Sequence, residues 1–162
     1  MLFGWLAGWL ARIVLALVGL AVLGAIVFET EVGELSLKLD ASLAPIATKR
    51  MTTLVERGYF DGNIMHRVDP SFVVQFGSPH ADGYAGPPDL PPLRCETSPN
   101  PFEQGSVGVA LSGRDTGSSQ LFVMRGRHPH LDGKYALVGT SSGPWDAVIE
   151  GDAILKASLR RE

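Results

Sequence analysis

The stretch 58-GYFDGNIMHRVDPSFVVQFG-77 decides the fold, because two apolar runs flank a proline-containing turn and one run contains a cation. A three-residue turn at 69–71 is predicted to join two strands as a hairpin. In that register Arg67 lies across from Val73, and Gln75 is its diagonal neighbour on the same face. Two interpretations remain open: the Arg67 and Gln75 side chains hold a peptide carbonyl, or Arg67 is simply solvated on an edge strand.

The chain around this hairpin is also predicted to be mainly β. Apolar and polar residues alternate on both sides of Val32 and Gly33, which predicts a first hairpin over 25–40. Further candidate strands lie at 64–68, 72–76, 106–111, 120–124, 136–138 and within 153–159. An amphipathic helix is predicted over 44–57 and a short second helix over 143–151. The pattern therefore predicts a closed, β-rich sheet with two helical covers.

Composition limits the function classes. With 162 residues, 45% of them hydrophobic, the chain is long enough for one domain with its own core. A net charge of −3 without a run of Lys or Arg gives no basis for nucleic-acid binding. Cys95 is the single cysteine, which excludes an internal disulfide. The long loop at 78–102, rich in Pro and Gly, is expected to be functional or to pack over the sheet.

The N-terminal segment has a different character from the rest. Its first 28 residues carry one charged side chain, Arg12, which is typical of a membrane-spanning helix. We expect an uncleaved signal anchor over residues 1–25 and a folded domain over 26–162, with a cleaved signal peptide as the alternative. The anchor would tether the domain to a membrane on the extracytoplasmic or periplasmic side. Cleavage would release it as a secreted protein.

Two blocks of the sequence resemble a known family. The stretch at 58–77 resembles the cyclophilin signature, in which a His-Arg pair precedes a proline turn, a Phe and a Gln-Gly end. A second block, 117-GSSQLFVMRGRHPHLDGKYALVG-139, is similar to the family's Ser-Gln-Phe-Phe strand and its Leu-Asp-Gly-Lys loop. The resemblance extends over 26–159. It implies a closed eight-stranded antiparallel barrel capped by two helices, with peptidyl-prolyl cis-trans isomerase activity on proline-containing client segments.

The resemblance also implies roles for individual residues. The family's catalytic arginine falls on Arg67, and Phe72 and Gln75 stand beside it as catalytic residues. The implied substrate-binding positions are Val73, Ala110, Leu111, Gln120, Phe122, His130, Leu131 and Tyr135. No metal or other cofactor is implied.

Four of these positions depart from the family's usual residues. Val73 stands where the family usually has Met, and Leu111 where it commonly has Asn. His130 stands in place of the Trp with which many eukaryotic members bind cyclosporin, and Tyr135 in place of the pocket His. The apolar parts of these side chains still predict a pocket that accepts a proline ring.

Other chemistry finds weaker support in the sequence. His128 and His130 present two imidazoles, but no carboxylate or cysteine pattern completes a metal site. Ser118 and Ser119 lack a nucleophile-elbow pattern and an identifiable His-Asp pair. Two functional classes remain: a membrane-anchored prolyl isomerase, and a tethered module that binds proline-containing segments with little turnover.

Overall fold

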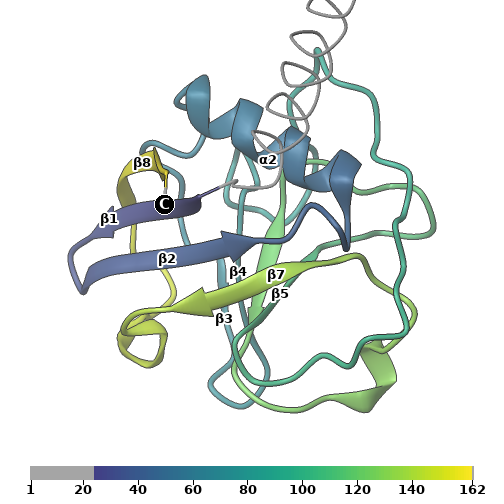
Figure 1. Ribbon diagram of the computed structural model, residues 1–162. Helices are drawn as coiled ribbons and strands as arrows, with labels where there is room; N and C mark the ends of the chain where they lie inside the picture. The colour runs from purple at the N-terminus through teal and green to yellow at the C-terminus, as the bar shows by residue number, and fades with distance from the viewer. Residues whose placement is uncertain (1–23, 162) are drawn as a thin grey trace, which may run out of the picture.

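An eight-stranded antiparallel sheet organises the computed structural model, which describes residues 24–161. Along the sheet the strands follow the order β3-β4-β6-β5-β7-β2-β1-β8. The strands are β1 (Ala25–Thr30), β2 (Gly33–Leu39), β3 (Arg67–Val68), β4 (Val73–Phe76), β5 (Ser106–Val109), β6 (Leu121–Met124), β7 (Leu137–Ser142) and β8 (Ile154–Arg160). The one α-helix within residues 24–161, α2 (Pro45–Glu56), lies beside β1 and β2 in the upper part of Figure 1. The prediction of a mainly β, antiparallel fold is confirmed.

The two edge strands of the sheet approach each other without forming a ladder. The segment before β3 meets the start of β8 through one bridge between Ile64 and Ala153. Four backbone bonds join the segments around it. Met65 N–H donates to the Asp152 carbonyl at 2.8 Å and Ile154 N–H to the Asn63 carbonyl at 2.9 Å, while Gly62 N–H donates to the Ile154 carbonyl at 2.7 Å and Gly151 N–H to the Met65 carbonyl at 3.0 Å. The sheet is therefore curled. The expected fully closed barrel is not formed by strand ladders within residues 24–161.

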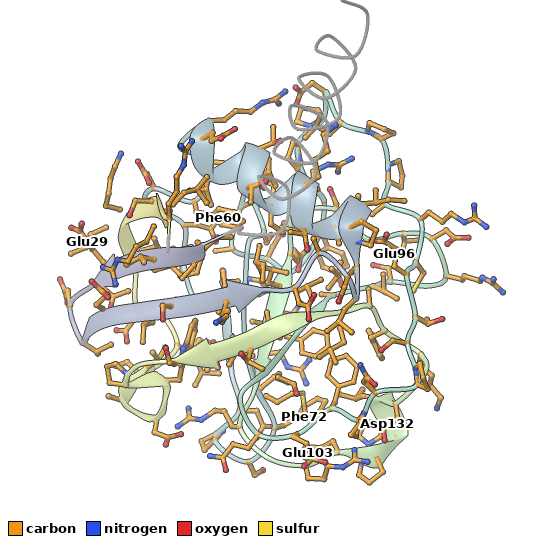
Figure 2. All side chains as sticks on the ribbon, in the orientation of Figure 1. Glu29, Phe60, Phe72, Glu96, Glu103 and Asp132 are labelled. Atoms are coloured by element: carbon orange, nitrogen blue, oxygen red, sulfur yellow. The ribbon has the colours of Figure 1, made fainter. Side chains whose placement is uncertain are left out.

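Inward-facing side chains of the strands fill the core beneath α2 (Figure 2). In β2, Leu35, Leu37 and Leu39 alternate with polar residues and are buried, as a sheet with one covered face requires. Phe28 and Phe76 meet edge to face, with ring centroids 5.3 Å apart. Such aromatic pairs add specific geometry to the burial of apolar area.

The α2 helix agrees closely with the predicted range of 44–57, and specific residues explain where it begins and ends. Pro45 opens it, and the two carboxylate oxygens of Glu96 accept the N–H groups of Ile46 and Ala47 at 3.0 and 2.9 Å. A carboxylate there satisfies free donors and complements the helix dipole. At the other end Gly58 adopts a positive φ of 69° and donates to the Val55 carbonyl, which closes the last turn.

The second predicted helix, over 143–151, is wrong. The structure forms only a short 3-10 turn, η2 (Trp145–Ala147), and Val148 is already extended. Positive φ values at Gly143 and Gly151 bend the chain at both ends of this segment, which leaves too few residues for an α-helix. Trp145 is buried and stacks on Phe76 of the core.

The predicted signal anchor over 1–25 lies almost entirely outside the described residues. Between residues 24 and 161, no helix has both the length and the apolar character needed to cross a membrane. Strand β1 begins at Ala25.

Candidate active site

The hairpin that carries Arg67 has a register two residues away from the predicted one along β4, so the same side chains stay on the same face. Arg67 pairs directly with Gln75, rather than lying opposite Val73. The reason is Asp69, whose N–H donates to the Val73 carbonyl at 2.8 Å and whose carboxylate accepts the Ser71 N–H at 3.1 Å. Asp69 therefore belongs to the hairpin stem. The three-residue connection is 70–72, and the two predicted catalytic side chains come face to face.

Strand alternation places a second apolar cluster on the outer face of the sheet. Val73 of β4 and Phe122 of β6 point away from the core and pack with Phe102, Met124, Leu131 and Leu137. Above this cluster lies a hollow of about 200 Å³, here called the central hollow. Its lining consists of Arg67, Phe72, Val73, Gln75, Ala110, Leu111, Phe122, Leu131 and Tyr135. The structure thus brings together nine of the eleven predicted site residues.

The other two predicted residues lie next to the central hollow. Gln120 lines an adjoining hollow of about 260 Å³, which shares Gln75, Ala110 and Leu111 with the central one. His130 is exposed and lies over the outer side of the Phe72 ring, with ring centroids 5.9 Å apart. It therefore supports Phe72 rather than lining the hollow.

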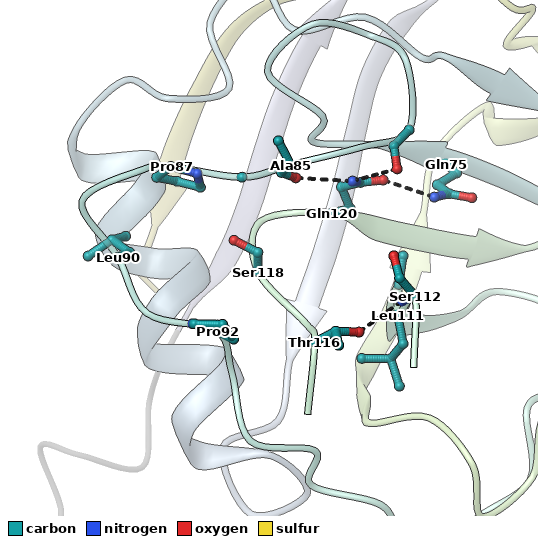
Figure 3. Close-up of a pocket in the computed structure, with 13 residues that line it drawn as sticks. Gln75, Ala85, Pro87, Leu90, Pro92, Leu111, Ser112, Thr116, Ser118 and Gln120 are labelled. Carbon is teal, nitrogen blue, oxygen red and sulfur yellow. Dashed lines mark hydrogen bonds between the residues drawn. The ribbon is translucent and has the colours of Figure 1, made fainter. Parts of the chain in front are cut away.

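A chain of amide contacts holds the polar edge of the hollow (Figure 3). The Gln75 amide nitrogen donates to Gln120 Oε1 at 3.0 Å. Gln120 Nε2 in turn donates to the carbonyls of Gly83 and Ala85 at 2.9 and 3.2 Å. The Gln120 side chain thereby connects the sheet to the long loop at 78–102. The Gln75 carboxamide is held by this contact in a fixed orientation beside Arg67.

The Arg67 guanidinium lies at the mouth of the hollow. Its Cζ atom is 5.4 Å from the centroid of the Phe72 ring, within the range of a cation–π contact. The side chain is exposed, and no carboxylate forms an ion pair with it among residues 24–161. The planar donors of Arg67 are therefore available to a ligand that fills the hollow.

Two residues that the sequence analysis did not identify shape the floor of the hollow. The Phe102 ring stacks on Phe122 with centroids 5.6 Å apart. Gly108 lies directly behind both rings: a Cβ atom there would be 2.3 Å from Phe122 Cζ and 2.8 Å from Phe102 Cε1. A glycine inside an apolar strand is a signal of such close approach. Phe102, in a long loop, offered no comparable signal.

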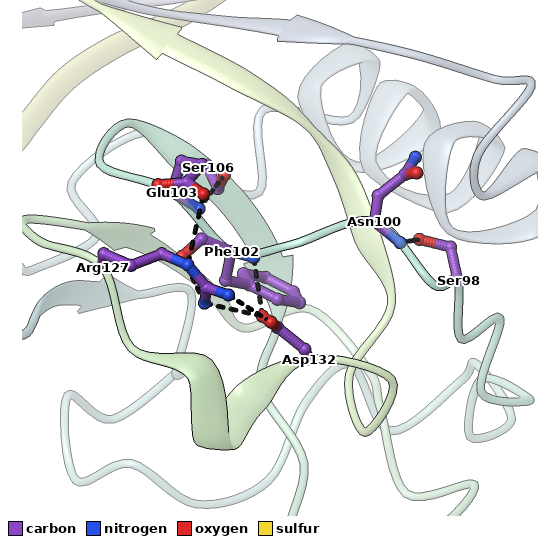
Figure 4. Close-up of polar contacts among 7 residues, drawn as sticks. All are labelled: Ser98, Asn100, Phe102, Glu103, Ser106, Arg127 and Asp132. Carbon is purple, nitrogen blue, oxygen red and sulfur yellow. Dashed lines mark hydrogen bonds and ion pairs between the residues drawn. The ribbon is translucent and has the colours of Figure 1, made fainter.

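An ion-pair cluster fixes the turn that carries Leu131 (Figure 4). Asp132 Oδ1 accepts the Phe102 N–H at 2.8 Å and Arg127 Nη1 at 2.9 Å, while Arg127 Nε contacts Glu103 at 3.2 Å. The Arg127 guanidinium and the Phe102 amide lower the pKa of the Asp132 carboxyl. Asp132 therefore connects η1 (Pro129–Leu131) to the loop that supplies Phe102.

Replacing Asp132 with Asn is expected to lower kcat/KM for proline peptides by about two- to fivefold, mainly through KM. The amide still accepts from Phe102 but loses the ion pair with Arg127, so Leu131 and Phe102 are less firmly held. Steady-state kinetics over a range of peptide concentrations measures the effect. Glu103→Gln is the matched control, since Glu103 touches the same guanidinium from a more exposed position. An equal loss in both variants would contradict a positioning role for Asp132.

His66, next to Arg67 in sequence, points away from the central hollow toward the loop. Its Nε2 atom would be 3.7 Å from a Cβ at Gly83, and neither ring nitrogen has a hydrogen-bond partner within residues 24–161. Burial lowers the pKa of the imidazole, although a contact with the Ile64 backbone, too poor in geometry to count as a hydrogen bond, and the charges of Asp82 and Glu150 act in the opposite direction. The neutral form of His66 is therefore the one that fits the folded protein.

The folded protein is expected to lose stability as the pH decreases, because the fold disfavours the protonated form of His66. In the unfolded chain His66 is protonated below its ordinary pKa of about 6.5, whereas in the folded protein it stays neutral until a lower pH. Between these two pKa values a decrease in pH therefore favours the unfolded state. Urea unfolding at about pH 7.5 and about pH 5.5 measures this loss. His66→Gln is expected to show a smaller loss than wild type, whereas His80→Gln, at an exposed position, keeps the wild-type loss. An unchanged pH dependence in His66→Gln would refute the assignment.

The histidines at 128 and 130 pack around Phe72 in the structure. His128 Nε2 bonds the Ser71 carbonyl at 2.8 Å, and the two imidazole centroids are 5.6 Å apart. Within residues 24–161 no three His, Cys, Asp or Glu side chains are grouped as a metal site requires.

Fold and site together define a class: an antiparallel β protein with an outward-facing hollow suited to a peptide group attached to an apolar ring. The sequence matches the family described as cyclophilin type peptidyl-prolyl cis-trans isomerase/CLD over residues 25–153. The chain belongs to this family, whose members isomerise X-Pro bonds.

Individual relatives agree with this assignment. A peptidyl-prolyl cis-trans isomerase of Helicobacter pylori strain J99 is 36% identical over 133 residues, covering 78% of this chain and 81% of the relative. One of Synechococcus elongatus is 38% identical over 138 residues, covering 82% and 94%. The crystal structure of a Cryptosporidium parvum cyclophilin in the presence of the dipeptide Ala-Pro matches the fold with a TM-score of 0.74, at 22% identity, covering 84% of this chain and 98% of that one.

Proposed function

We propose that the central hollow is the isomerisation site and that it holds the proline of a client segment. The observation that carries this proposal is the direct pairing of Arg67 with Gln75 beside the apolar surface formed by Val73, Phe122 and Leu131. Apolar side chains receive the pyrrolidine ring, and the polar edge faces the peptide bond before it. The Ala-Pro dipeptide named for the Cryptosporidium structure supports clients of this kind.

The chemistry follows from the resistance of the peptide bond to rotation. Resonance gives the C–N bond a rotational barrier of about 18–20 kcal/mol, and no covalent bond has to break for the isomers to exchange. When the amide twists, resonance is lost and the prolyl nitrogen gains a lone pair. A donor that bonds this nitrogen stabilises the twisted state but neither planar isomer, which is the condition for catalysis.

Each residue of the hollow then has a distinct task. Arg67 donates to the prolyl nitrogen, and Gln75 orients Arg67 or the client carbonyl. Phe72, Val73, Phe122, Leu131 and the Tyr135 ring hold the proline, while Ala110 and Leu111 form the wall toward the adjoining hollow. Gln120 fixes Gln75. Oriented donors in a partly dry site avoid the reorganisation that water would need.

Exchange spectroscopy by NMR tests this assignment on a proline peptide. Catalytic amounts of protein are expected to produce cis-trans exchange, and amide shifts on peptide addition are expected at Gln75 and Phe122. Val73, Leu111, His130 and Tyr135 favour a second candidate, a binding module with little turnover. That candidate predicts the same amide shifts without exchange of the peptide.

For cellular location, we propose a membrane tether formed by the N-terminal segment, with the domain outside the cytoplasm. Support comes from the apolar run that precedes β1, residues 1–24, with Arg12 as its one charge. Cell fractionation with N-terminal sequencing of the mature protein is the test. An intact N-terminus in the membrane fraction is expected, and a shortened soluble form identifies a cleaved signal peptide instead.

A further inference from the structure

We propose that a basic groove beside the central hollow binds an acidic side chain of the client segment whose proline occupies that hollow. The inference rests on the proposed function and adds a charge preference to it. Arg114 and Lys134 are among the residues that line the groove, together with Cys95 and Thr97. Its volume of about 570 Å³ exceeds that of the central hollow.

The groove is continuous with the proposed proline site. Leu111 and Tyr135 line both, so the two spaces adjoin each other at these side chains. An extended chain advances by about 3.3–3.6 Å per residue. A client held by its proline therefore reaches the groove within two or three residues. The groove lies on the Tyr135 side, whereas the hollow that contains Gln120 lies on the Gln75 side.

Charge decides what the groove accepts. Arg114 and Lys134 line it, and no carboxylate does. Two carboxylates, Asp115 and Glu96, act on the Cys95 thiol from outside the lining. The Asp115 carboxylate is 3.8 Å from Arg114 Nε and also accepts the Cys95 N–H at 2.8 Å. Within residues 24–161 the Lys134 ammonium forms no ion pair, and the Arg114 side chain is 91% exposed. The charged side chains that line the groove itself are both cations, which favours a carboxylate as the ligand.

Kinetics on matched peptides measures the preference. An alanine host peptide with one proline is prepared with Glu or Gln at each of three positions on either side of the proline. At one position the Glu peptide is expected to have a kcat/KM about three- to fivefold above its Gln partner at low salt, as exposed ion pairs allow. The ratio is expected to fall toward one at high ionic strength.

Variants connect that preference to the groove. Lys134→Gln and Arg114→Gln are each expected to lower the Glu-to-Gln ratio, and the double variant to abolish it. Lys49→Gln is the matched control: it removes the same charge from an exposed position on α2 that lines none of these hollows, and it is expected to keep the ratio.

Occupancy is read independently of turnover through the single cysteine of the chain. Cys95 lies in the groove wall, and its thiol donates to the Lys134 carbonyl. Burial and the charge of Asp115 raise the pKa of this thiol, so alkylation by iodoacetamide is followed in mildly alkaline buffer. The preferred Glu peptide is expected to slow alkylation more than its Gln partner does. Replacing the proline of that peptide with alanine is expected to remove the protection.

The outcomes separate the two proposals. Equal kcat/KM for every Glu and Gln pair, or equal alkylation rates with both peptides, overturns the acidic-segment proposal. A preference that survives in the double variant overturns it as well. Absence of isomerisation for the alanine host peptide itself overturns the proposed function instead, and alkylation protection then still tests binding at the groove.

Discussion

Replacing Arg67 with alanine is expected to reduce kcat/KM for X-Pro isomerisation by about 100- to 1000-fold, the usual effect of removing a donor aimed at a transition state. The loss is expected in kcat rather than KM, because the donor acts on the twisted amide and the apolar bed still holds the proline. A direct, protease-free isomerisation assay provides both constants. Since Arg67 is exposed, the urea midpoint is expected to stay close to wild type.

The Arg67→Lys variant tests whether the charge of Arg67 alone is sufficient for activity. It keeps the positive charge but loses the planar set of donors, so an intermediate activity is expected if geometry as well as charge matters. Wild-type activity no greater than that of Arg67→Ala would sink the catalytic assignment and leave a binding module.

Replacing Gly108 with alanine is expected to have the second large effect, on both stability and kcat/KM. The added Cβ would lie 2.3 Å from Phe122 Cζ, so the Phe122 ring, which lines the hollow, must move. We expect a loss of about 1–3 kcal/mol in stability, as overpacking usually causes. We also expect a decrease of about tenfold in kcat/KM, equivalent to about 1.4 kcal/mol. Urea unfolding and the same isomerisation assay measure the two effects.

A compensating substitution distinguishes a moved ring from general damage. Phe102 is the other ring behind Gly108, so Gly108→Ala combined with Phe102→Leu returns space to Phe122. Partial recovery of kcat/KM in the double variant is expected. If the double variant is no more active than Gly108→Ala, the activity of the site does not depend on the position of Phe122 as described.

Sequence reasoning located most of the site because the decisive residues belong to two contiguous blocks. Alternation along β4 and β6 separates outward-facing side chains such as Val73 and Phe122 from core residues, and this rule holds in the structure. The position of Gln120 beside the hollow and the supporting role of His130 depend on contacts between distant segments. Those contacts are not encoded in any local pattern.

The errors also have physical causes. The turn moved by one residue and the hairpin register by two, because the Asp69 side chain stabilises the turn from within the stem. The second helix was predicted from Pro144 and Gly151, but seven residues between two glycines with positive φ form a turn. The closed barrel was expected from the strand count, whereas β3 has only two residues to offer a partner.

Glu96 couples the start of α2 to the wall of the basic groove. Its carboxylate accepts the amides of Ile46 and Ala47, and the preceding residue, Cys95, lines the groove. The two amides lie some fifty residues from Glu96 in the sequence, yet their protection from solvent depends on that carboxylate. If a client segment restrains the groove wall, we expect hydrogen–deuterium exchange of these two amides to slow.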